Sequence, residues 1–298
     1  MIEQFIHAGI IDPEHITTLE QYVKEDDNKR IIFLDTTFVL PTSAENIADN
    51  FKKKRIQNAV FFDIKAIADK DSPLPHMLPS KEQFENALSA LGIKNDDIII
   101  PYGQHGMIMG PARVWWMLKG FGHKNVMVLN GGLPAWEKAG YETETGEPQH
   151  FNRTTYSASE FQSTMLMDMK TLIDISAQSM HPIIDARPFT RFNGSTPEPR
   201  EGMRSGHIPN SMSLPCSSLV TEEGQFKDTA TLGALFEDIG ISINENKPDT
   251  IITTCGSGIT ACALSLALHN VGYKGNVAVY DGSWSEWGLK NSPTIVIT

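Results

Sequence analysis

The chain has 298 residues and a formal net charge of −11, from 25 Lys and Arg against 36 Asp and Glu. This length fits two domains of ordinary size better than one, and the acidic balance argues against nucleic acid as a partner, because phosphate neutralisation needs Lys and Arg in excess. The densest basic run, at residues 52–55, is short and is predicted to be a solvated helix face.

The N-terminal residues contain no basic region followed by a long apolar stretch, and no run approaches the ~20 apolar residues that a membrane span needs. We therefore expect a cytoplasmic protein with no membrane partner. Three cysteines, Cys216, Cys255 and Cys262, are too few for a disulfide framework. No set of His and Cys has the spacing of a structural zinc site, so no metal site is expected.

Short apolar runs alternate with longer amphipathic segments along the first half of the chain. Strands are predicted at 31–35, 59–62, 98–102 and 126–129, and helices at 82–91 and 113–121. Ser80 to Gln83 has the pattern of a capping box at the start of the first of these helices. A polar segment with Gly and Pro follows at 142–149 and is predicted to be part of a linker.

The second half of the chain repeats this alternation. Strands are predicted at 183–185, 251–254 and 277–280, and helices at 230–239 and 259–271, the last ended by Gly272. Strands this apolar, alternating with helices, predict a mostly parallel central sheet with helices on both faces. The expected fold class is therefore α/β.

The two halves match each other at an offset near 150 residues. Asp35 and Asp185 end similar apolar runs 150 residues apart, and Trp136 and Trp287 follow similar runs 151 residues apart. Several matches in the same order at nearly one offset indicate an internal duplication. We predict a first domain at 1–141, a linker and connecting segment at 142–170, and a second domain at 171–298.

A candidate nucleophile lies at a strand-to-helix turn of the second copy, where Cys255 opens Cys-Gly-Ser-Gly-Ile-Thr-Ala. Unpartnered backbone N–H groups and the helix dipole at such a turn favour a thiolate. The alternative is a buried cysteine that only packs, but Gly256 and Gly258 bring backbone close to the sulfur, which packing does not require. We predict that Cys255 is catalytic and that Cys216 and Cys262 pack.

The equivalent loop of the first copy, at 102–111, has glycines but no cysteine. It cannot form a persulfide or a thioester, so the first copy is predicted not to be an independent catalytic unit. No Gly-Lys-Ser/Thr follows these glycines, which argues against a nucleotide-binding loop.

Four arginines and one histidine are further candidates. The arginines are Arg187, Arg191, Arg200 and Arg204. They follow the strand at 183–185, at the carboxyl edge of the sheet where α/β proteins bind ligands. Their guanidinium groups either fork onto a carboxylate or an anionic sulfur compound or pair with Glu198 and Glu201, and the residues alone leave both open. His76, in the proline-braced loop 71–79, is either structural or functional.

These features together resemble the two-domain rhodanese superfamily over nearly the whole chain. Besides the duplication, the motifs are Cys-Gly-Ser-Gly-Ile-Thr-Ala at 255–261, Gly-His-Ile-Pro at 206–209, Pro-Ala-Arg-Val-Trp-Trp at 111–116 and Ser-Pro-Leu-Pro-His-Met-Leu-Pro at 72–79. The resemblance implies tandem duplicated rhodanese-like domains, the second of them catalytic. Members that use thiosulfate tend to carry two basic residues directly after the cysteine, whereas members that use 3-mercaptopyruvate tend to carry Gly-Ser/Thr-Gly, as here.

The resemblance also implies a reaction: sulfur moves from 3-mercaptopyruvate to a thiol or cyanide through a persulfide on Cys255, and pyruvate leaves. Arg191 and Arg200 are implied to bind the substrate carboxylate, because the family's two arginines are nine residues apart in the same Arg-Phe…Glu-Pro-Arg segment. Ser257 is suited to hydrogen-bond the substrate or relay a proton. The other substrate-binding residues implied are Gly256, Gly258, Ile259, Thr260 and His76.

No metal or organic cofactor is implied. The partners implied are a small-molecule sulfur donor and a thiol acceptor, either a small thiol or a thioredoxin-like protein. The family often has an acidic residue eleven positions before its histidine, in a proton relay, but this chain has Lys65 there, and Asp63 fits a structural Phe-Phe-Asp pattern. The resemblance therefore does not extend to a carboxylate–histidine relay.

Three other functions stay open at this point. Thiosulfate is an alternative donor. Dual-specificity phosphatases share this active-site architecture, but an arginine about six residues after the cysteine closes their loop, where this chain has Ala261 and Cys262. A non-enzymatic sulfur carrier would not need Arg191 and Arg200.

Overall fold

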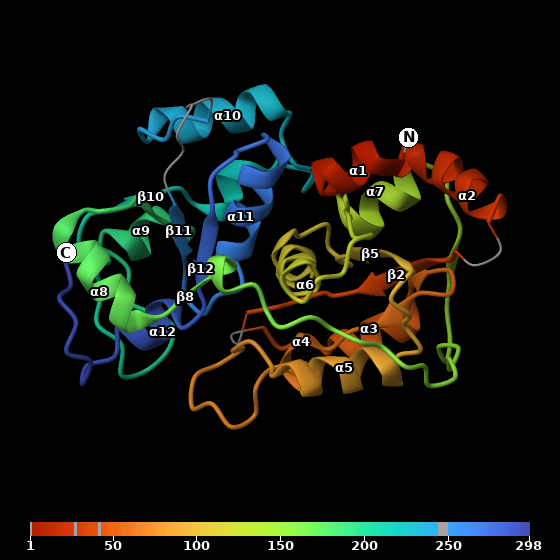
Figure 1. The fold of residues 1–298 in the computed structure, drawn as a ribbon, viewed down its shortest axis with the longest axis horizontal. Helices are drawn as coiled ribbons and strands as arrows, with labels where there is room; N and C mark the ends of the chain where they lie inside the picture. Colours follow the sequence, from red (N-terminus) through yellow and green to blue (C-terminus); the bar gives the residue numbers. More distant parts are fainter. Residues whose placement is uncertain (1, 27–28, 41–42, 244–249) are drawn as a thin grey trace. The chain divides into compact units, whose positions relative to one another are not determined.

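The structure is a computed structural model that describes residues 2–26, 29–40, 43–243 and 250–298 (Figure 1). The chain forms two compact units. Unit 1 comprises residues 1–69, 79–161 and 221–226, and unit 2 comprises residues 70–78, 162–220 and 227–298. Each unit includes one short segment from the other half of the chain. We call these segments the 70–78 strap and the 221–226 strap.

Unit 1 alternates strands and helices. Its helices are α1 (Ile2–Ala8), α2 (Ile16–Lys24), α3 (Ile47–Lys53), α4 (Ile64–Ile67), α5 (Lys81–Ala90), α6 (Met109–Gly120) and α7 (Gly132–Lys138), with a 3-10 turn at Pro13–His15. Its strands are β1 (Ile10–Ile11), β2 (Ile31–Asp35), β3 (Arg55–Ile56), β4 (Val60–Phe61), β5 (Ile98–Tyr102), β6 (Val128–Leu129) and β7 (Thr143–Glu144). Parallel pairing joins β4, β2 and β5 in that order and also joins β1 to β6.

Strand β5 shows why the sheet of unit 1 is covered on both faces. Because side chains alternate across a strand, Ile98, Ile100 and Tyr102 lie in one hydrophobic core, which also holds residues of α1, α2 and α7. Ile99 points to the opposite face, and it is fully buried as well. Figure 1 shows α1 and α7 on one side of β2 and β5 and α5 on the other. An apolar strand without polar alternation is therefore the pattern that this two-sided burial requires.

Unit 2 is built on one five-stranded sheet with the order β10-β9-β11-β12-β8, in which every pairing is parallel. Its strands are β8 (Leu166–Met167), β9 (Ile183–Asp185), β10 (Ser211–Ser213), β11 (Ile251–Thr254) and β12 (Val277–Tyr280). Its helices are α8 (Met169–Gln178), α9 (Phe189–Phe192), α10 (Thr229–Asp238), α11 (Ala261–Asn270) and α12 (Ser283–Trp287), with 3-10 turns at Ser163–Met165 and Cys216–Leu219. The expected α/β class with mainly parallel sheets is confirmed.

Local sequence signals act where they were predicted. Ser80 and Gln83 form the capping box of α5, each side chain accepting the other residue's backbone N–H. Gly272 follows α11 with a φ of 79°, which glycine adopts without strain. Helix α6 begins at Met109, before the predicted residue 113, and α11 begins only at Ala261, because the preceding residues form the loop that carries Cys255.

The basic run at 52–55 is a solvated helix face only in part. Lys52 and Lys53 end α3 and are exposed, but Arg55 lies in β3 with only 2% of its surface exposed. Its Nε donates to Glu144 at 2.7 Å, and its Nη1 donates to the Gly146 carbonyl at 2.8 Å. The first part of the expected linker is therefore packed on unit 1 as strand β7, while the predicted boundaries of the two domains stay a prediction.

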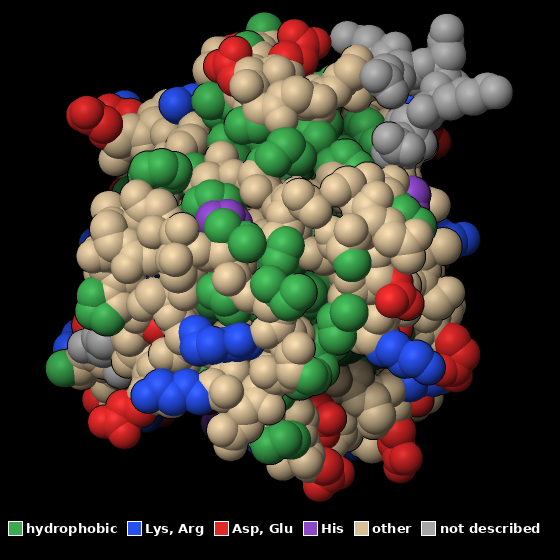
Figure 2. Space-filling model, turned by 90° about the vertical axis from the view of Figure 1, so that its left-hand side faces the viewer, with side chains coloured by type: hydrophobic (Ala, Val, Ile, Leu, Met, Phe, Trp, Pro, Cys, Tyr) green, Lys and Arg blue, Asp and Glu red, His purple; other side chains and the backbone are tan. Residues whose placement is uncertain are grey.

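Hydrophobic side chains are also exposed, and Figure 2 shows them gathered near the centre of one face of the molecule. In unit 2 the large exposed hydrophobic residues are Leu166, Met180, Phe189, Leu289, Ile295 and Ile297. Phe189 is 58% exposed and is the first residue of α9. An aromatic side chain this exposed is available to a binding partner.

Candidate active site

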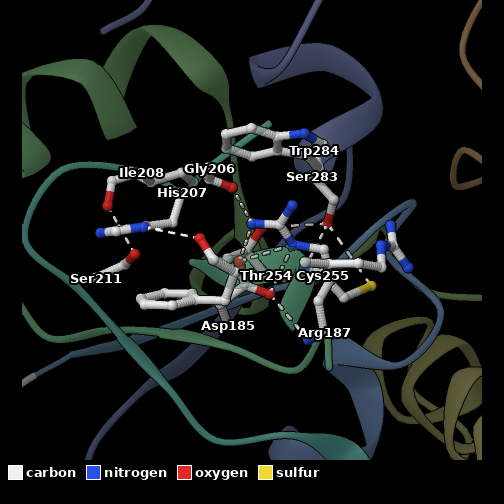
Figure 3. Close-up of polar contacts among 12 residues, drawn as sticks. Asp185, Arg187, Gly206, His207, Ile208, Ser211, Thr254, Cys255, Ser283 and Trp284 are labelled. Carbon is white, nitrogen blue, oxygen red and sulfur yellow. Dashed lines mark hydrogen bonds and ion pairs between the residues drawn. The ribbon is translucent and has the colours of Figure 1, made fainter. Parts of the chain in front are cut away.

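Cys255 lies at the carboxyl end of a central strand of unit 2. Thr254, the last residue of β11, pairs with Asp185 at the end of β9, and Cys255 follows directly. The Cys255 side chain is 2% exposed. Parallel α/β sheets bind ligands at this edge, so the thiol stands where the sequence predicted it, between β11 and α11 (Figure 3).

The side chain of Ser283 supports the loop that carries Cys255. Its Oγ accepts the backbone N–H groups of Cys255 and Gly258, both at 3.1 Å, and donates to the Tyr280 carbonyl at 2.7 Å. The same Oγ lies 4.0 Å from the sulfur of Cys255 (Figure 3). Because a carbonyl can only accept, the hydroxyl proton of Ser283 is committed to Tyr280, and its lone pairs face the loop. Ser283 is fully buried and has a φ of 49°, which is uncommon for a residue other than glycine.

Two carbonyl groups of the loop accept hydrogen bonds, whereas several of its amide groups donate none among the described residues. The N–H groups of Trp284 and Ser285 donate to the carbonyls of Cys255 and Gly256, both at 2.9 Å. In contrast, four N–H groups of the loop donate to no acceptor in the described part of the chain; they belong to Gly256, Ser257, Ile259 and Thr260. Open amides around a buried sulfur favour an anion there. The N–H groups of Gly256, Ser257, Ile259 and Thr260 are therefore available as backbone donors in the loop that carries the thiol, while that of Gly258 is bound to Ser283.

Arg191 and Arg200 converge on the same glycine of this loop. A Cβ placed on Gly256 would lie 3.2 Å from Nη2 of Arg191 and 3.7 Å from Nη1 of Arg200. Nη2 of Arg200 also lies 3.3 Å from the Ser257 hydroxyl. Two guanidinium groups beside one thiol form a site for a carboxylate or another anion. The structure thus brings together the two arginines that the resemblance selected.

The four candidate arginines have different partners. Arg187 is 1% exposed and forks onto Asp185 (Figure 3). It also donates to Glu198 at 2.8 Å. Arg191 donates to both oxygens of Glu198. Arg204 holds the C-terminal segment through carbonyl groups and a hydroxyl. Arg187 and Arg204 are therefore structural, while Arg191 both pairs and faces the loop.

Arg200 and Arg204 both lack an ion pair with a carboxylate among the residues that the structure describes, but only Arg200 lies at the thiol loop. Burial lowers the pKa of its guanidinium below the ordinary value, and the nearby Cys255 sulfur opposes this shift. An arginine remains charged throughout the ordinary pH range. Arg200 therefore presents a half-buried positive charge, not held in an ion pair, to an incoming anion.

His76 reaches the site from the 70–78 strap. Its Nδ1 lies 3.1 Å from the Ser257 hydroxyl, whose oxygen also accepts from Arg200. Since arginine can only donate, the hydroxyl of Ser257 can donate its own proton to Nδ1 of His76 in the tautomer that carries the imidazole proton on Nε2. Lys65 lies over the Phe38 ring in unit 1, and the Asp63 carboxylate caps α4.

The other two cysteines are less suited to nucleophilic attack. Burial raises the pKa of the Cys216 thiol to about 12, and the negative charge of Cys255 adds to this shift. Cys262 is buried in α11 and its sulfur lies 3.2 Å from the Gly258 carbonyl. Cys216 is therefore protonated near neutral pH.

The first copy has an equivalent loop. The Leu133 N–H donates to the Gly103 carbonyl at 3.0 Å, as the Trp284 N–H donates to the Cys255 carbonyl at 2.9 Å. Gly103 therefore occupies the position of Cys255, and the first copy lacks a thiol as predicted. Its helix α6 begins against other backbone, because a Cβ on Gly110 would lie 1.8 Å from the Thr36 carbonyl oxygen.

Comparison with known proteins decides the family. The rhodanese-like domain matches residues 18–139 and 168–290, an offset of 150 at the first residue that confirms the duplication. The chain belongs to the rhodanese family. It is 39% identical to the 3-mercaptopyruvate sulfurtransferase of Escherichia coli, over 89% of this chain and 91% of the relative. It is 36% identical to thiosulfate/3-mercaptopyruvate sulfurtransferase 1, mitochondrial, of Arabidopsis thaliana, over 91% of this chain and 74% of the relative.

The whole fold is shared with a solved member of the family. The Tum1 protein of Saccharomyces cerevisiae superposes with a TM-score of 0.86 and 32% identity, covering 97% of each chain. Similarity over nearly the full length to several sulfurtransferases makes this chain a sulfurtransferase. The names of the relatives include both 3-mercaptopyruvate and thiosulfate as donors.

The rhodanese site contains residues that the sequence did not single out. Ser283 supports the loop, and Asp281 holds the 70–78 strap. Glu198, which the sequence suggested only as a salt-bridge partner, binds both Arg187 and Arg191. A signal existed for Ser283: it aligns with Gly132 in the duplication, so a serine stands in one copy where a glycine stands in the other. Asp281 aligns with Asn130 in the same way, but no signal pointed to its partner Leu78, which is 203 residues away.

No helix among the described residues is long and apolar enough to cross a membrane. The cytoplasmic location stays a prediction. In unit 1, the ligand atoms of Asp12, Glu14 and His15 lie within 4.8 Å of one another, but Asp12 accepts a hydrogen bond from Asn130 at 2.7 Å. The absence of a metal requirement stays a prediction as well.

Proposed function

We propose that this sulfurtransferase takes its sulfur from 3-mercaptopyruvate and transfers it through a persulfide on Cys255. The observation that carries this proposal is the convergence of Arg191 and Arg200 on Gly256, beside the thiol. Gly256 leaves room there for a carboxylate, which two guanidinium groups bind by charge-assisted hydrogen bonds. A basic side chain at position 256, as in thiosulfate-using members, would stand in that space.

The proposed reaction begins with the Cys255 thiolate attacking the sulfur of the bound donor. The new S–S bond forms as the C–S bond breaks, and the bonding electrons leave on carbon as the enolate of pyruvate. The donor's own S–H proton balances the step: it passes to the Ser257 and His76 pair and returns to the enolate carbon. The products are a Cys255 persulfide anion and pyruvate, with no oxidant or reductant consumed.

The thiol loop stabilises negative charge in this reaction, while Ser257 and His76 transfer the proton. The open N–H groups of the loop hold the negative charge of the thiolate and then of the persulfide. Ser257 is suited to the relay because its hydroxyl lies 3.1 Å from Nδ1 of His76 and 3.3 Å from Arg200. A second thiol or cyanide then attacks the outer sulfur, which regenerates Cys255 and completes a ping-pong cycle.

We propose a small thiol or a thioredoxin-like protein as the acceptor. The exposed Phe189 supports a protein acceptor, because it lies on α9, the helix that also carries Arg191. Phe189 therefore offers a protein acceptor an exposed apolar contact two residues along the chain from Arg191.

Thiosulfate is the second candidate donor. The same two arginines suit its sulfonate oxygens, and one relative is named for both donors. We expect kcat/KM to be higher for 3-mercaptopyruvate, because Gly256 and Ser257 add no positive charge to match a dianion. A higher kcat/KM for thiosulfate would reverse the assignment of the donor and leave the persulfide mechanism intact.

Intact mass spectrometry tests the mechanism. After incubation with 3-mercaptopyruvate and no acceptor, the protein should gain the mass of one sulfur atom. Cys255→Ser should gain nothing, whereas Cys216→Ser, as the matched control, should gain sulfur like the unmodified chain. An unchanged mass for the unmodified chain would reject the proposal.

A further inference from the structure

The two units exchange equivalent segments of chain. The 70–78 strap comes from the first copy but belongs to unit 2, and the 221–226 strap comes from the second copy but belongs to unit 1. Their first residues, Lys70 and Thr221, are 151 residues apart, which is the offset of the internal duplication. The exchange is therefore reciprocal and belongs to the repeat itself.

Each strap is anchored by the same kind of hydrogen bond. The Leu78 N–H donates to Oδ2 of Asp281 at 2.7 Å, and the Phe226 N–H donates to Oδ1 of Asn130 at 2.7 Å. Asp281 directly follows β12 and Asn130 directly follows β6, again 151 residues apart. Both anchors are buried. The same bond in two diverged copies indicates that the strap requires it.

The two straps contact different loops, of which only the one in unit 2 carries a thiol. In unit 2 the strap presents His76 to Ser257 at 3.1 Å. In unit 1 the other strap covers the loop that lacks a thiol, so closely that a Cβ on Gly224 would lie 2.8 Å from the Gly106 carbonyl oxygen. Only the anchor in unit 2 therefore bears on chemistry.

We propose that Asp281 is a positioning residue, which anchors the 70–78 strap so that His76 meets Ser257. His76 has a φ of 63°, a left-handed conformation that costs free energy for a residue other than glycine and persists only when its surroundings enforce it. The bond to Leu78, two residues further on, supplies that restraint. This inference rests on the proposed function, because Asp281 is assigned to position His76, a member of the proposed proton relay.

The anchor and the thiol loop are supported by neighbouring residues. Asp281 holds the strap, and Ser283, two residues later, holds the N–H groups of Cys255 and Gly258. The residues that follow β12 thereby position both the loop that carries Cys255 and the strap that carries His76. Removing the Asp281 carboxylate should release the strap and leave the thiol loop in place.

Three variants test the anchor. Asp281→Asn keeps an amide oxygen at the acceptor position, as Asn130 does naturally, and should retain kcat for 3-mercaptopyruvate within about 3-fold. Asp281→Ala should lower kcat about 10-fold. Leu78→Pro removes the N–H donor while leaving Asp281 in place, and it should lower kcat to the same extent. Asn130→Ala is the matched control: it should release the other strap, detected by faster hydrogen exchange over 221–226, without lowering kcat.

A double-mutant cycle separates positioning from general stability. If Asp281 acts through His76, the variant with both His76→Ala and Asp281→Ala should be no slower than His76→Ala alone. Losses that multiply would overturn the proposal, as would full kcat in Asp281→Ala or in Leu78→Pro when hydrogen exchange over 72–79 shows a released strap. The rate at which iodoacetamide alkylates Cys255 should stay the same in Asp281→Ala, because Ser283 still supports the loop.

These outcomes differ from a failure of the proposed function. If the unmodified chain gains no sulfur from 3-mercaptopyruvate, the donor and the relay are wrong, whatever the exchange data show. If it gains sulfur, and the released strap leaves kcat unchanged, the function stands and the role of Asp281 is wrong.

Discussion

Arg191 and Arg200 differ in their partners although both lie over Gly256. Glu198, itself nearly buried, compensates much of the charge on Arg191, whereas Arg200 faces no carboxylate in the described part of the chain. A bound carboxylate therefore gains more from Arg200, which has no competing ion pair to share. At the scale of residues, binding of a substrate carboxylate therefore depends on which arginine is not already held in an ion pair.

Arg200→Ala should lower kcat/KM for 3-mercaptopyruvate more than Arg191→Ala does. We expect a loss of about 10-fold or more for each, since a hydrogen bond to a charged group contributes roughly 1.5–3 kcal/mol. Arg153→Ala, which removes an exposed arginine bonded to Asn86 in unit 1, is the control and should leave kcat/KM unchanged. A larger loss in Arg191→Ala would show that Glu198 positions its arginine more than it neutralises it.

Gly256 is needed for space rather than for backbone freedom, because its φ lies outside the left-handed region. A Cβ there would meet Arg191 at 3.2 Å, closer than most contacts of a real Cβ. Gly256→Ala should therefore raise KM for 3-mercaptopyruvate about 3- to 10-fold with an unchanged Tm. Gly233→Ala, in α10 with open space around the new Cβ, is the matched control and should not alter KM.

At the scale of elements, His123 shows how a buried polar side chain joins a helix to its neighbours. His123 follows α6, and its Nε2 lies 3.0 Å from the Asp97 carbonyl, which can only accept. Its Nδ1 lies 3.0 Å from the hydroxyl of Tyr156 and must therefore accept that proton. Burial lowers the pKa of His123 to about 4, so the ring is neutral in the folded protein.

The sign of the resulting pH dependence follows from that depressed pKa. The unfolded chain takes up a proton near the ordinary value of 6.5 and the folded chain only near 4, so stability is fully present above about pH 7 and falls as the pH drops through this window. The loss reaches on the order of 3 kcal/mol at pH 4. In urea titrations of His123→Gln, which keeps a neutral donor and acceptor, this part of the loss should disappear. An equal loss in both proteins would assign the pH dependence to other groups.

At the scale of the whole molecule, the two copies share a backbone conformation at equivalent positions but differ in the side chains that they place there. Ser283 and Gly132 have left-handed φ values of 49° and 56° at equivalent positions. In unit 2 the serine hydroxyl fits under the thiol loop, but in unit 1 a Cβ would lie 2.2 Å from the Gly103 carbonyl oxygen. The first copy therefore has no room for the side chain that supports the catalytic loop.

Exchanging these residues should give opposite phenotypes. Ser283→Gly relieves backbone strain but removes the acceptor for the N–H groups of Cys255 and Gly258, so kcat/KM should fall about 10-fold or more while Tm changes little. Gly132→Ser should lower Tm by several degrees, because it places atoms against the Gly103 carbonyl. Thermal melts and steady-state rates check both. A Ser283→Gly protein with full activity would exclude the hydroxyl from catalysis.

Much of the fold and part of the site could be predicted from sequence because the signals are local. Apolar runs without alternation indicated strands buried on both faces, Ser80 and Gln83 indicated a capping box, and a repeated order of motifs indicated the duplication. The position of Cys255 followed from its place between a strand and a helix. Each of these signals lies within a few residues or recurs at one fixed offset, so no knowledge of distant contacts was needed.

The tertiary structure decided the features that depend on distant contacts. The residues alone left open whether the arginines bind a substrate or form salt bridges within their own loop. The answer differs between them: Arg187 is paired with Asp185 and Glu198, whereas Arg200 forms no ion pair with a carboxylate among the described residues. The bond from Leu78 to Asp281 spans 203 residues. A hydrogen bond between two distant loops depends on where folding brings them, so neither segment alone indicates its partner. The sequence by itself therefore determined the place of the Cys255 thiol between a strand and a helix and the repeated fold. The tertiary structure decided which charges lie at the thiol loop and what holds His76 beside Ser257.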